Sequence, residues 1–326
     1  MTRVFVLCEF SEGSTLAPLS GEMIGAARRI AGDGGVDAAL VGSGVAGLAA
    51  QAAAYGADRV FVADNEVFAD YQAEAFMPAL AALVESADPD VILMGQTNAG
   101  RDLAPRLAFR LKTAAAMDVV EIKTDGGGVQ FTRPFFGGAA RADVAIKGRP
   151  AIATVRPKSQ DEPEQDASRS AETITVDVSP DPATFKVRII ETTQVESEGV
   201  RLEDADVVIS GGRGLGNSDG FRELEEIAKL LRGAVGASRA VCDMGWYPVA
   251  NQVGLTGKVV SPTLYIAVGI SGASQHMAGC AGSKNIVTIN KDPDANIIAA
   301  SRFAVVGDWK PIVEGFKKKV GELRSS

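Results

Sequence analysis

Four glycine-rich segments of this 326-residue chain have the residue types and spacing to hold a nucleotide. The first is VGSGVAGLAA at 41–50, where Gly42, Gly44 and Gly47 have the G-x-G-x-x-G spacing that dinucleotide-binding folds place between a strand and a helix. Asp64 ends the next apolar run, where such folds keep the acid that contacts a ribose. The segment is a candidate nucleotide site, and it fits a tight strand-to-helix turn equally well.

The other three segments lie in the C-terminal half, and each is predicted to follow or lead into a strand. They are SGGRGLGN at 210–217, QVGLTGK at 252–258 and GISGASQH at 269–276. Loops at the carboxyl ends of parallel strands gather at one edge of a sheet, so we expect these three to line one crevice. In the third, Gly272 and Ala273 precede a predicted helix, and free backbone N–H groups there would suit a pyrophosphate.

Charged and titratable side chains near these loops favour a nucleotide-like cofactor over a hydrolytic triad. Arg213 and Arg239 can neutralise a phosphate or face a ring that gains negative charge. His276 is the single histidine, which excludes a metal site built on several histidines. We therefore expect no metal, while His276 fits a packing role at its helix terminus as well as a functional one.

Composition excludes several classes of protein. The net charge is −8, and no basic block precedes the C-terminal KKK, so we expect neither nucleic-acid binding nor attachment to a membrane surface. Cys8, Cys242 and Cys280 are too few and too scattered for a disulfide framework, which favours a reducing compartment. The N-terminal segment resembles a first strand more than a signal peptide, and no apolar stretch approaches the roughly 20 residues that cross a bilayer. We expect a cytoplasmic protein without membrane insertion.

Alternating apolar and helix-like segments predict an α/β protein of two domains, each a mainly parallel doubly wound sheet. We place the domains at 1–194 and 195–326, the second with a Rossmann-like arrangement. Within the first, residues 126–157 resemble added antiparallel strands, and residues 158–172 an exposed loop. Within the second, apolar residues of 218–233 share one helical face, and a longer apolar stripe runs through 309–323.

Residues 264–297, LYIAVGISGASQHMAGCAGSKNIVTINKDPDANI, closely resemble the signature of the electron-transfer flavoprotein alpha subunit, the FixB type. The segments VVISGGRGLGN, VGASRAVCD and NQVGLTGK match upstream in order and spacing, so the resemblance covers residues 205–309. The N-terminal half is similar more loosely, through its alternating pattern and TVRPK at 154–158.

The resemblance implies an electron carrier rather than a substrate-converting enzyme. It implies an alpha subunit that pairs with a beta subunit and holds FAD in its C-terminal domain. The FAD would collect electrons from dehydrogenases, such as acyl-CoA dehydrogenases in fatty acid oxidation, and pass them to a membrane quinone oxidoreductase or a similar acceptor. The N-terminal domain, with the Gly42 segment as a tight turn, would help to clasp the beta subunit.

The resemblance also implies roles for individual residues. Arg239 would stabilise a reduced anionic flavin, the Thr256 hydroxyl would lie near the flavin N5, and His276 would face the pyrimidine edge. Residues 271–276 would hold the pyrophosphate and ribityl region, and three later residues the adenosine part. The full set of implied FAD contacts is Arg213, Ser238, Arg239, Val253, Gly254, Leu255, Thr256, Ser271, Gly272, Ala273, Ser274, Gln275, His276, Asn290, Asp308 and Trp309.

The sequence departs from the family pattern at two places, and it allows three alternative functions. Leu255 stands where many members have glutamine, which changes the polarity near the flavin, and Ser301-Arg302-Phe303-Ala304 replaces the common Ala-Asp-Tyr-Gly. An electron-bifurcating flavoprotein that oxidises NADH is the nearest alternative. An NAD(P)-dependent dehydrogenase using the Gly42 segment and a non-redox nucleotide-binding regulator are the others.

Overall fold

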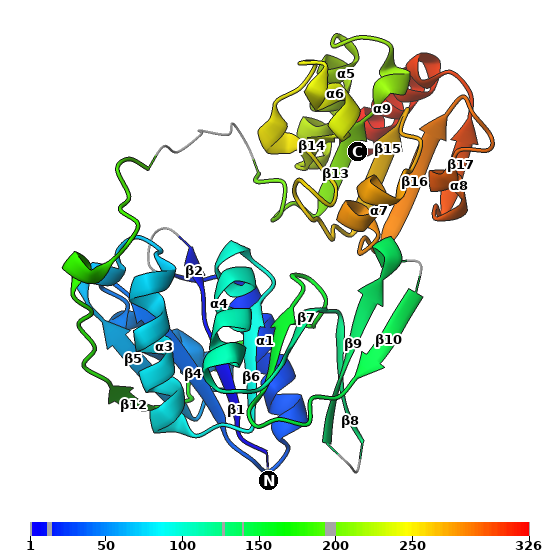
Figure 1. Cartoon of the computed structure of the whole chain (residues 1–326). Coiled ribbons are helices and arrows are strands. Elements are labelled where there is room, and N and C mark those ends of the chain that lie inside the picture. Colours follow the sequence, from blue (N-terminus) through cyan, green and yellow to red (C-terminus); the bar gives the residue numbers. More distant parts are fainter. Residues whose placement is uncertain (1, 12–14, 126–127, 139, 193–199, 326) are drawn as a thin grey trace. The chain divides into compact units, whose positions relative to one another are not determined.

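The chain forms two compact units, which a computed structural model describes over residues 2–11, 15–125, 128–138, 140–192 and 200–325 (Figure 1). Unit 1 comprises residues 1–134 and 141–192, and unit 2 comprises residues 135–140 and 193–326. The predicted boundary between residues 194 and 195 lies outside the described residues. Residues 135–140 group with unit 2, within which Gly138 lies beside Ala281.

Unit 1 is built on a seven-stranded sheet. Its strands are β1 (Val4–Leu7), β4 (Val36–Gly42), β5 (Arg59–Asp64), β6 (Val91–Gly95), β7 (Ala115–Val119), β11 (Ala151–Val155) and β12 (Glu172–Thr175). They lie in the order β12-β5-β4-β1-β6-β11-β7, and neighbouring strands run parallel. This arrangement is the predicted parallel sheet.

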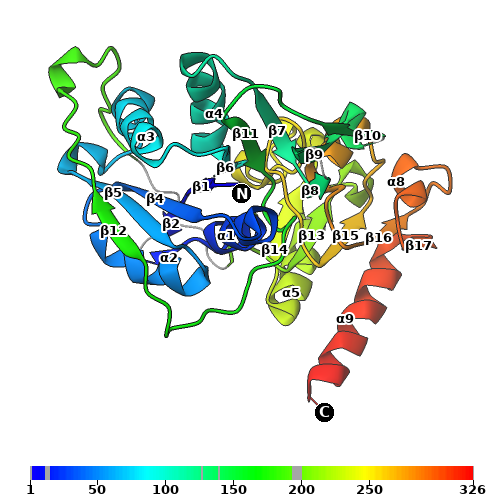
Figure 2. The same ribbon diagram turned by 90° about the horizontal axis from the view of Figure 1, so that it is seen from below.

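Helices cover both faces of the sheet in unit 1. They are α1 (Pro18–Ala31), α2 (Ala49–Tyr55), α3 (Ala73–Ala87) and α4 (Asn98–Arg110). Figure 2 shows α1 and α2 on one side of β1, β4 and β5, with α3 and α4 on the other. Successive strand residues point to opposite faces, so Val4 packs toward α1 while Phe5 packs toward α3 and α4. The doubly wound arrangement predicted for this domain is confirmed.

The prediction of antiparallel strands over residues 126–157 is wrong for β11. An antiparallel sheet is present, with β8 (Glu121–Asp125), β9 (Gly128–Phe135) and β10 (Ala140–Val144) in the order β10-β9-β8. In contrast, β11 lies between β6 and β7 in the parallel sheet, and all five of its residues are buried. An apolar strand buried on both faces is typical of a central parallel strand. The hairpin β2 (Phe10–Ser11) and β3 (Thr15–Leu16) completes the strands of unit 1.

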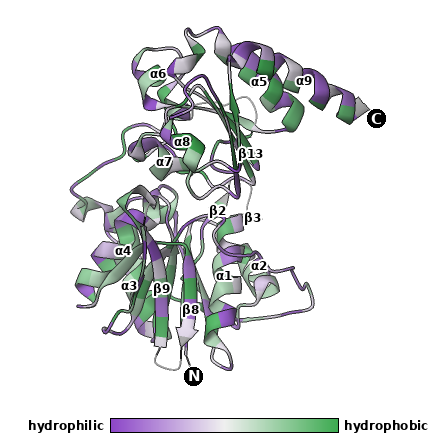
Figure 3. Ribbon diagram, turned by 90° about the vertical axis from the view of Figure 1, so that its right-hand side faces the viewer, coloured by the Kyte–Doolittle hydropathy of each residue, from purple (hydrophilic) through white to green (hydrophobic). Residues whose placement is uncertain are grey.

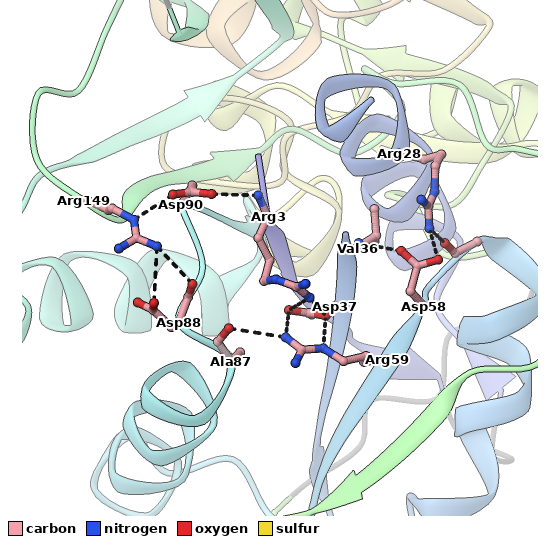
Figure 4. A network of polar contacts seen from close by, with 11 residues as sticks. Arg3, Arg28, Val36, Asp37, Asp58, Arg59, Ala87, Asp88, Asp90 and Arg149 are labelled. Carbon is pink, nitrogen blue, oxygen red and sulfur yellow. Dashed lines mark hydrogen bonds and ion pairs between the residues drawn. The ribbon is translucent and has the colours of Figure 1, made fainter. Parts of the chain in front are cut away.

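A network of arginines and aspartates joins the amino ends of the strands in unit 1 (Figure 4). The Asp37 carboxylate is fully buried on β4, and it accepts hydrogen bonds from Arg59 Nε at 2.8 Å and Nη2 at 2.7 Å. Arg3 Nη1 also donates to Asp37, at 3.1 Å. These contacts join β4 to β5 and to the residue before β1, and so they hold the strands together. They lie at the end of the sheet opposite to the usual ligand edge.

Unit 2 contains a second parallel sheet. Its strands are β13 (Val207–Gly211), β14 (Ala234–Ala237), β15 (Leu264–Val268), β16 (Asn285–Asn290) and β17 (Phe303–Val306). The order is β14-β13-β15-β16-β17, with parallel pairing throughout. Its helices are α5 (Gly220–Leu231), α6 (Arg239–Asp243), α7 (Ser274–Cys280), α8 (Asn296–Ala299) and α9 (Trp309–Ser325). Residues of α6 were predicted as loop, and the structure makes them helical.

The two faces of this sheet are also covered by helices. Residues of α5, α6 and α9 pack on one face, and residues of α7 and α8 on the other. Both α5 and α9 carry apolar and polar residues around their circumference (Figure 3). The predicted apolar face of α5 is buried, whereas along α9 Trp309 and Val313 are buried but Leu323 is 66% exposed. No helix within the described ranges is long and apolar enough to span a membrane.

Candidate functional site

A cavity of about 600 Å³ lies at the carboxyl edge of the sheet in unit 2. This volume falls in the range of small-molecule and cofactor sites, roughly 300–1,000 Å³. Its lining comes from the loops after β13, β14, β15 and β16, together with the loop at 252–258. The lining residues are Arg213, Gly214, Ser238, Arg239, Ala240, Gln252, Val253, Gly254, Leu255, Thr256, Gly269, Ile270, Ser271, Ala273, Gln275, His276, Asn290, Asp292 and Ala295.

The loops after β13 and β15 are joined through their backbones. Gly212 N donates to Val268 O at 2.9 Å, and Gly214 N donates to Gly269 O at 2.9 Å. A Cβ added at Gly214 would lie 2.7 Å from Gly269 Cα. Glycine is required at residue 214 because only a bare backbone permits this approach.

The loop at 252–258 is fixed against α7 in the same way. Leu255 N donates to Gln275 O at 2.7 Å, and Val260 N donates to Gly279 O at 2.8 Å. A Cβ added at Gly279 would lie 2.3 Å from Gly254 N. The predicted crevice is therefore a set of loops held by backbone hydrogen bonds.

Two arginines give the cavity positive charge. Arg213 lies in the 3-10 turn Arg213–Leu215, and Arg239 is the first residue of α6. The Arg239 guanidinium pairs with Asp243 one turn later at 3.4 Å, and both side chains are about two-thirds exposed, at 68% and 64%. An exposed pair of this kind is weak, on the order of 0–1 kcal/mol, so Arg239 is available to an anionic ligand.

The hydroxyl of Thr256 is oriented by its neighbour. Gln252 Nε2 donates to Thr256 Oγ1 at 3.0 Å, and Gln252 itself is buried. Because the amide N–H uses a lone pair of the hydroxyl oxygen, the hydroxyl hydrogen is left to donate elsewhere. Thr256 is exposed on the cavity wall, where that donor can meet a ligand.

His276 forms a buried part of the cavity wall. Its Nε2 lies 2.9 Å from Tyr265 Oη, while Nδ1 makes no hydrogen bond of ordinary geometry among the described residues. Burial lowers the pKa of His276 from 6.5 to about 4, and the nearby backbone of Val253 opposes this shift only in part. The imidazole is therefore neutral at pH 7 and leaves one polar nitrogen without a partner.

Four of the predicted contact residues do not line the cavity. Gly272 packs against the backbone of Ile297, and the Ser274 hydroxyl donates to Gln275 Oε1 at 3.2 Å. Trp309 is buried in the core beside Gly220. Asp308 accepts from Lys310 N at 3.0 Å and pairs with Lys291 at 3.1 Å, so it begins α9 in the manner of an N-cap residue. The other predicted residues lie together around the cavity.

Sequence reasoning missed several of the lining residues. They are Gly214, Ala240, Gln252, Gly269, Ile270, Asp292 and Ala295. The glycines and Gln252 lie inside segments already selected for other residues, so extending each motif by its neighbours would have found them. Asp292 and Ala295 follow β16 at the same edge as the other loops, and the position of a loop after a parallel strand is the signal that could have indicated them.

The Gly42 segment of unit 1 is occupied by the chain's own carboxylate. Gly44 N donates to Asp64 Oδ1 at 2.7 Å, and Ala46 N donates to Asp64 Oδ2 at 3.0 Å. Gly44 has φ of +71°, which suits a tight turn. The backbone donors that would hold a phosphate and the acid that would contact a ribose bind each other, so this loop is a self-contained turn after β4.

The cofactor-sized cavity with a cationic rim agrees with the comparisons with known proteins. Residues 4–181 match the family model described as the electron transfer flavoprotein domain, and residues 201–281 match the electron transfer flavoprotein FAD-binding domain.

The electron transfer flavoprotein subunit alpha of Bacillus subtilis is 40% identical over 311 residues, which cover 95% of each chain. That of Thermoanaerobacterium thermosaccharolyticum is 40% identical over 307 residues, 93% of each chain. The protein FixB of Clostridium saccharobutylicum is 37% identical over 328 residues, 99% of this chain and 97% of the relative. The chain therefore belongs to the electron transfer flavoprotein alpha subunit and FixB family, with an FAD-binding domain in its C-terminal half.

Proposed function

We propose that this chain is the alpha subunit of a heterodimeric electron carrier that binds FAD in the cavity of unit 2. Electrons would pass from a dehydrogenase, such as an acyl-CoA dehydrogenase of fatty acid oxidation, to a quinone-linked oxidoreductase of the membrane. The observation that carries the proposal is the cavity itself, where a cationic rim, a directed hydroxyl and an unpartnered buried imidazole nitrogen converge. These groups fit a ligand with phosphates at one end and a polar ring that gains negative charge at the other.

Each of these residues has a distinct part in the proposed site. Bound FAD supplies the electron storage. Arg213 and Arg239 provide positive charge near the ring or the phosphates, while Thr256 donates its hydroxyl hydrogen and His276 remains neutral. Ser271, Ala273 and Gln275 would hold the pyrophosphate region, and Asn290 would contact the adenosine end. Asp308 and Trp309 follow Gly307, whose N donates to Asn290 O at 2.9 Å. The described lining holds one histidine, which is neutral and buried, and an electron carrier needs no proton-transfer residue at its cofactor.

Unit 1 and the environment of the protein complete the proposal. We assign residues 1–194 to holding a beta subunit, since the candidate nucleotide loop of this region, the Gly42 loop, is closed by Asp64. The three cysteines are free and buried, which supports a cytoplasmic location.

The experiment is an anaerobic visible spectrum of the heterodimer, recorded before and after reduction by two donors. An acyl-CoA dehydrogenase with its substrate should bleach the flavin, whereas NADH alone should leave it oxidised. Bleaching by NADH in a preparation free of other dehydrogenases would replace the proposal with the electron-bifurcating alternative. A heterodimer that binds no flavin would contradict both functions.

A further inference from the structure

A buried tyrosine contacts the histidine of the cavity from behind. Tyr265 lies on β15 and is fully buried, and His276 lies in the first turn of α7 with 7% of its surface exposed. Tyr265 Oη is 2.9 Å from His276 Nε2, a normal hydrogen-bond distance. The histidine thus has one nitrogen bonded in the core, while the other, Nδ1, is buried and makes no hydrogen bond of ordinary geometry among the described residues.

The number of hydrogens in this pair is fixed by burial. His276 is neutral at pH 7 because burial lowers its pKa to about 4, so the ring carries a single N–H. Burial also raises the pKa of Tyr265 well above its ordinary value, so the phenol keeps its one hydrogen. The direction of the bond between them therefore decides which imidazole nitrogen carries the hydrogen.

The surroundings of Tyr265 favour one direction. Ser210 and Cys280 are the other polar side chains near its hydroxyl. Ser210 Oγ makes no hydrogen bond of ordinary geometry among the described residues, and a thiol sulfur is a weak acceptor. His276 Nε2 is the strongest acceptor within reach of Tyr265 Oη.

The cavity side of the ring favours the same direction. The backbone of Val253 lies close enough to His276 to favour a hydrogen on the ring. Nε2 already faces Tyr265, so Nδ1 is the nitrogen left to meet this backbone, and a hydrogen on Nδ1 is favoured there.

We infer that Tyr265 is a positioning residue that donates its hydroxyl hydrogen to His276 Nε2 and so holds the imidazole in the Nδ1–H form. His276 then directs its neutral Nδ1–H toward the backbone of Val253, which belongs to the loop at 252–258 that lines the cavity. On the proposed function, on which this step rests, the fixed tautomer holds the ring and this loop in place beside the pyrimidine edge of a flavin.

The single histidine makes the test direct, because labelling this chain with [15N]histidine gives signals from one ring only. The labelled chain is combined with an unlabelled beta subunit, and its spectrum is recorded at pH 7 with FAD bound and after FAD removal. We expect a protonated Nδ1 and an unprotonated Nε2 in both states. A protonated Nε2 in the wild type would overturn the inference without any variant.

Two variants extend the test. Tyr265→Phe removes the hydroxyl and keeps the ring. The Val253 backbone still favours Nδ1–H, so the Nε2–H form should appear in part of the population, and FAD affinity should fall by about fivefold at most, the contribution of one hydrogen bond. Ser210→Ala, the matched control, removes the neighbouring hydroxyl and should leave the tautomer unchanged. A Tyr265→Phe chain that keeps the Nδ1–H form alone would overturn the assignment. In the wild type, an Nδ1–H form in a heterodimer that fails to bind FAD would contradict the proposed function alone, and FAD binding beside an Nε2–H form would contradict this inference alone.

Discussion

Arg239 lies in the wall of the cavity and pairs with Asp243 at 3.4 Å, so Asp243 would compete with a bound ligand for its charge. Arg239→Ala removes a positive charge from the cavity rim, and we expect the midpoint potential of the bound flavin to fall by tens of millivolts, equivalent to about 1 kcal/mol. Asp243→Asn removes the competing charge and should shift the potential in the opposite direction. Spectroelectrochemistry of the two heterodimers checks the signs, and Arg239→Lys serves as the charge-conserving control. Shifts of the same sign in both variants would show that this pair does not set the charge near the flavin.

Leu255 places an apolar side chain on the cavity wall, and it is 62% exposed. Leu255→Gln introduces an amide donor at the position where many family members carry glutamine. One additional hydrogen bond to the reduced flavin is worth about 1 kcal/mol, so the one-electron potential should rise by about 40 mV. The same redox titration measures this, with Leu255→Met as an apolar control that should leave the potential near the wild-type value.

The neutral state of His276 has a consequence for stability at low pH. Its pKa is about 4 in the folded chain and 6.5 in the unfolded one, so the unfolded state binds the proton first as the pH falls. We expect the free energy of unfolding to decrease by about 1.4 kcal/mol per pH unit from pH 6.5 down to about pH 4, and to be insensitive to this group above pH 6.5. Denaturant titrations of the wild-type and His276→Gln heterodimers between pH 5 and 8 should give curves that converge at low pH. Parallel curves would contradict the depressed pKa.

At the scale of elements, the apolar patterns of the sequence predicted most of the strands and the buried face of α5. Most strands of the two parallel sheets follow from short apolar runs, and the apolar face of α5 follows from a period of three to four residues. The loop cluster of the cavity followed from three glycine-rich segments, two of which come directly after the parallel strands β13 and β15. The sheet position of β11 did not, because a short apolar run has the same pattern in an antiparallel and in a central parallel strand.

Side-chain pairing within the elements could not be predicted from the sequence. The bond between Tyr265 and His276 joins a strand to a helix, and that between Gln252 and Thr256 depends on a turn. Neither pair has a spacing that distinguishes it from a chance neighbour. Asp64 is a case in which spacing was misleading. Its position in the sequence fits a ribose contact, whereas its carboxylate accepts hydrogen bonds from Gly44 N and Ala46 N.

The network at the amino ends of β1, β4 and β5 predicts a stability effect confined to unit 1. Asp37→Ala leaves Arg3 and Arg59 without their shared carboxylate, and because both arginines are partly exposed the loss should be about 2 kcal/mol. Asp88→Asn is the matched control, since Asp88 is 79% exposed where it pairs with Arg149. Chemical denaturation should separate the two variants, and an equal effect in both would contradict a structural role for the buried carboxylate.

At the scale of the whole molecule, the two units share a parallel doubly wound architecture but differ at the ligand edge. Unit 1 satisfies its glycine-rich turn internally through Asp64, whereas unit 2 leaves an open cavity with a cationic rim. The fold class alone therefore does not distinguish these two ligand edges, and the polar groups around them do.

The central claim, that FAD occupies the cavity of unit 2 and not the Gly42 loop, is tested most directly by flavin content. The measurement is the FAD-to-protein ratio from the visible spectrum of the purified heterodimer, for Ala273→Phe in the cavity wall and for Ala46→Phe in the Gly42 loop, two exposed alanines given the same substitution. We expect one FAD per heterodimer in the wild type and in Ala46→Phe, and a loss of FAD in Ala273→Phe without a change in subunit assembly. Loss of flavin from Ala46→Phe with full retention in Ala273→Phe would contradict the assignment of the cofactor to unit 2.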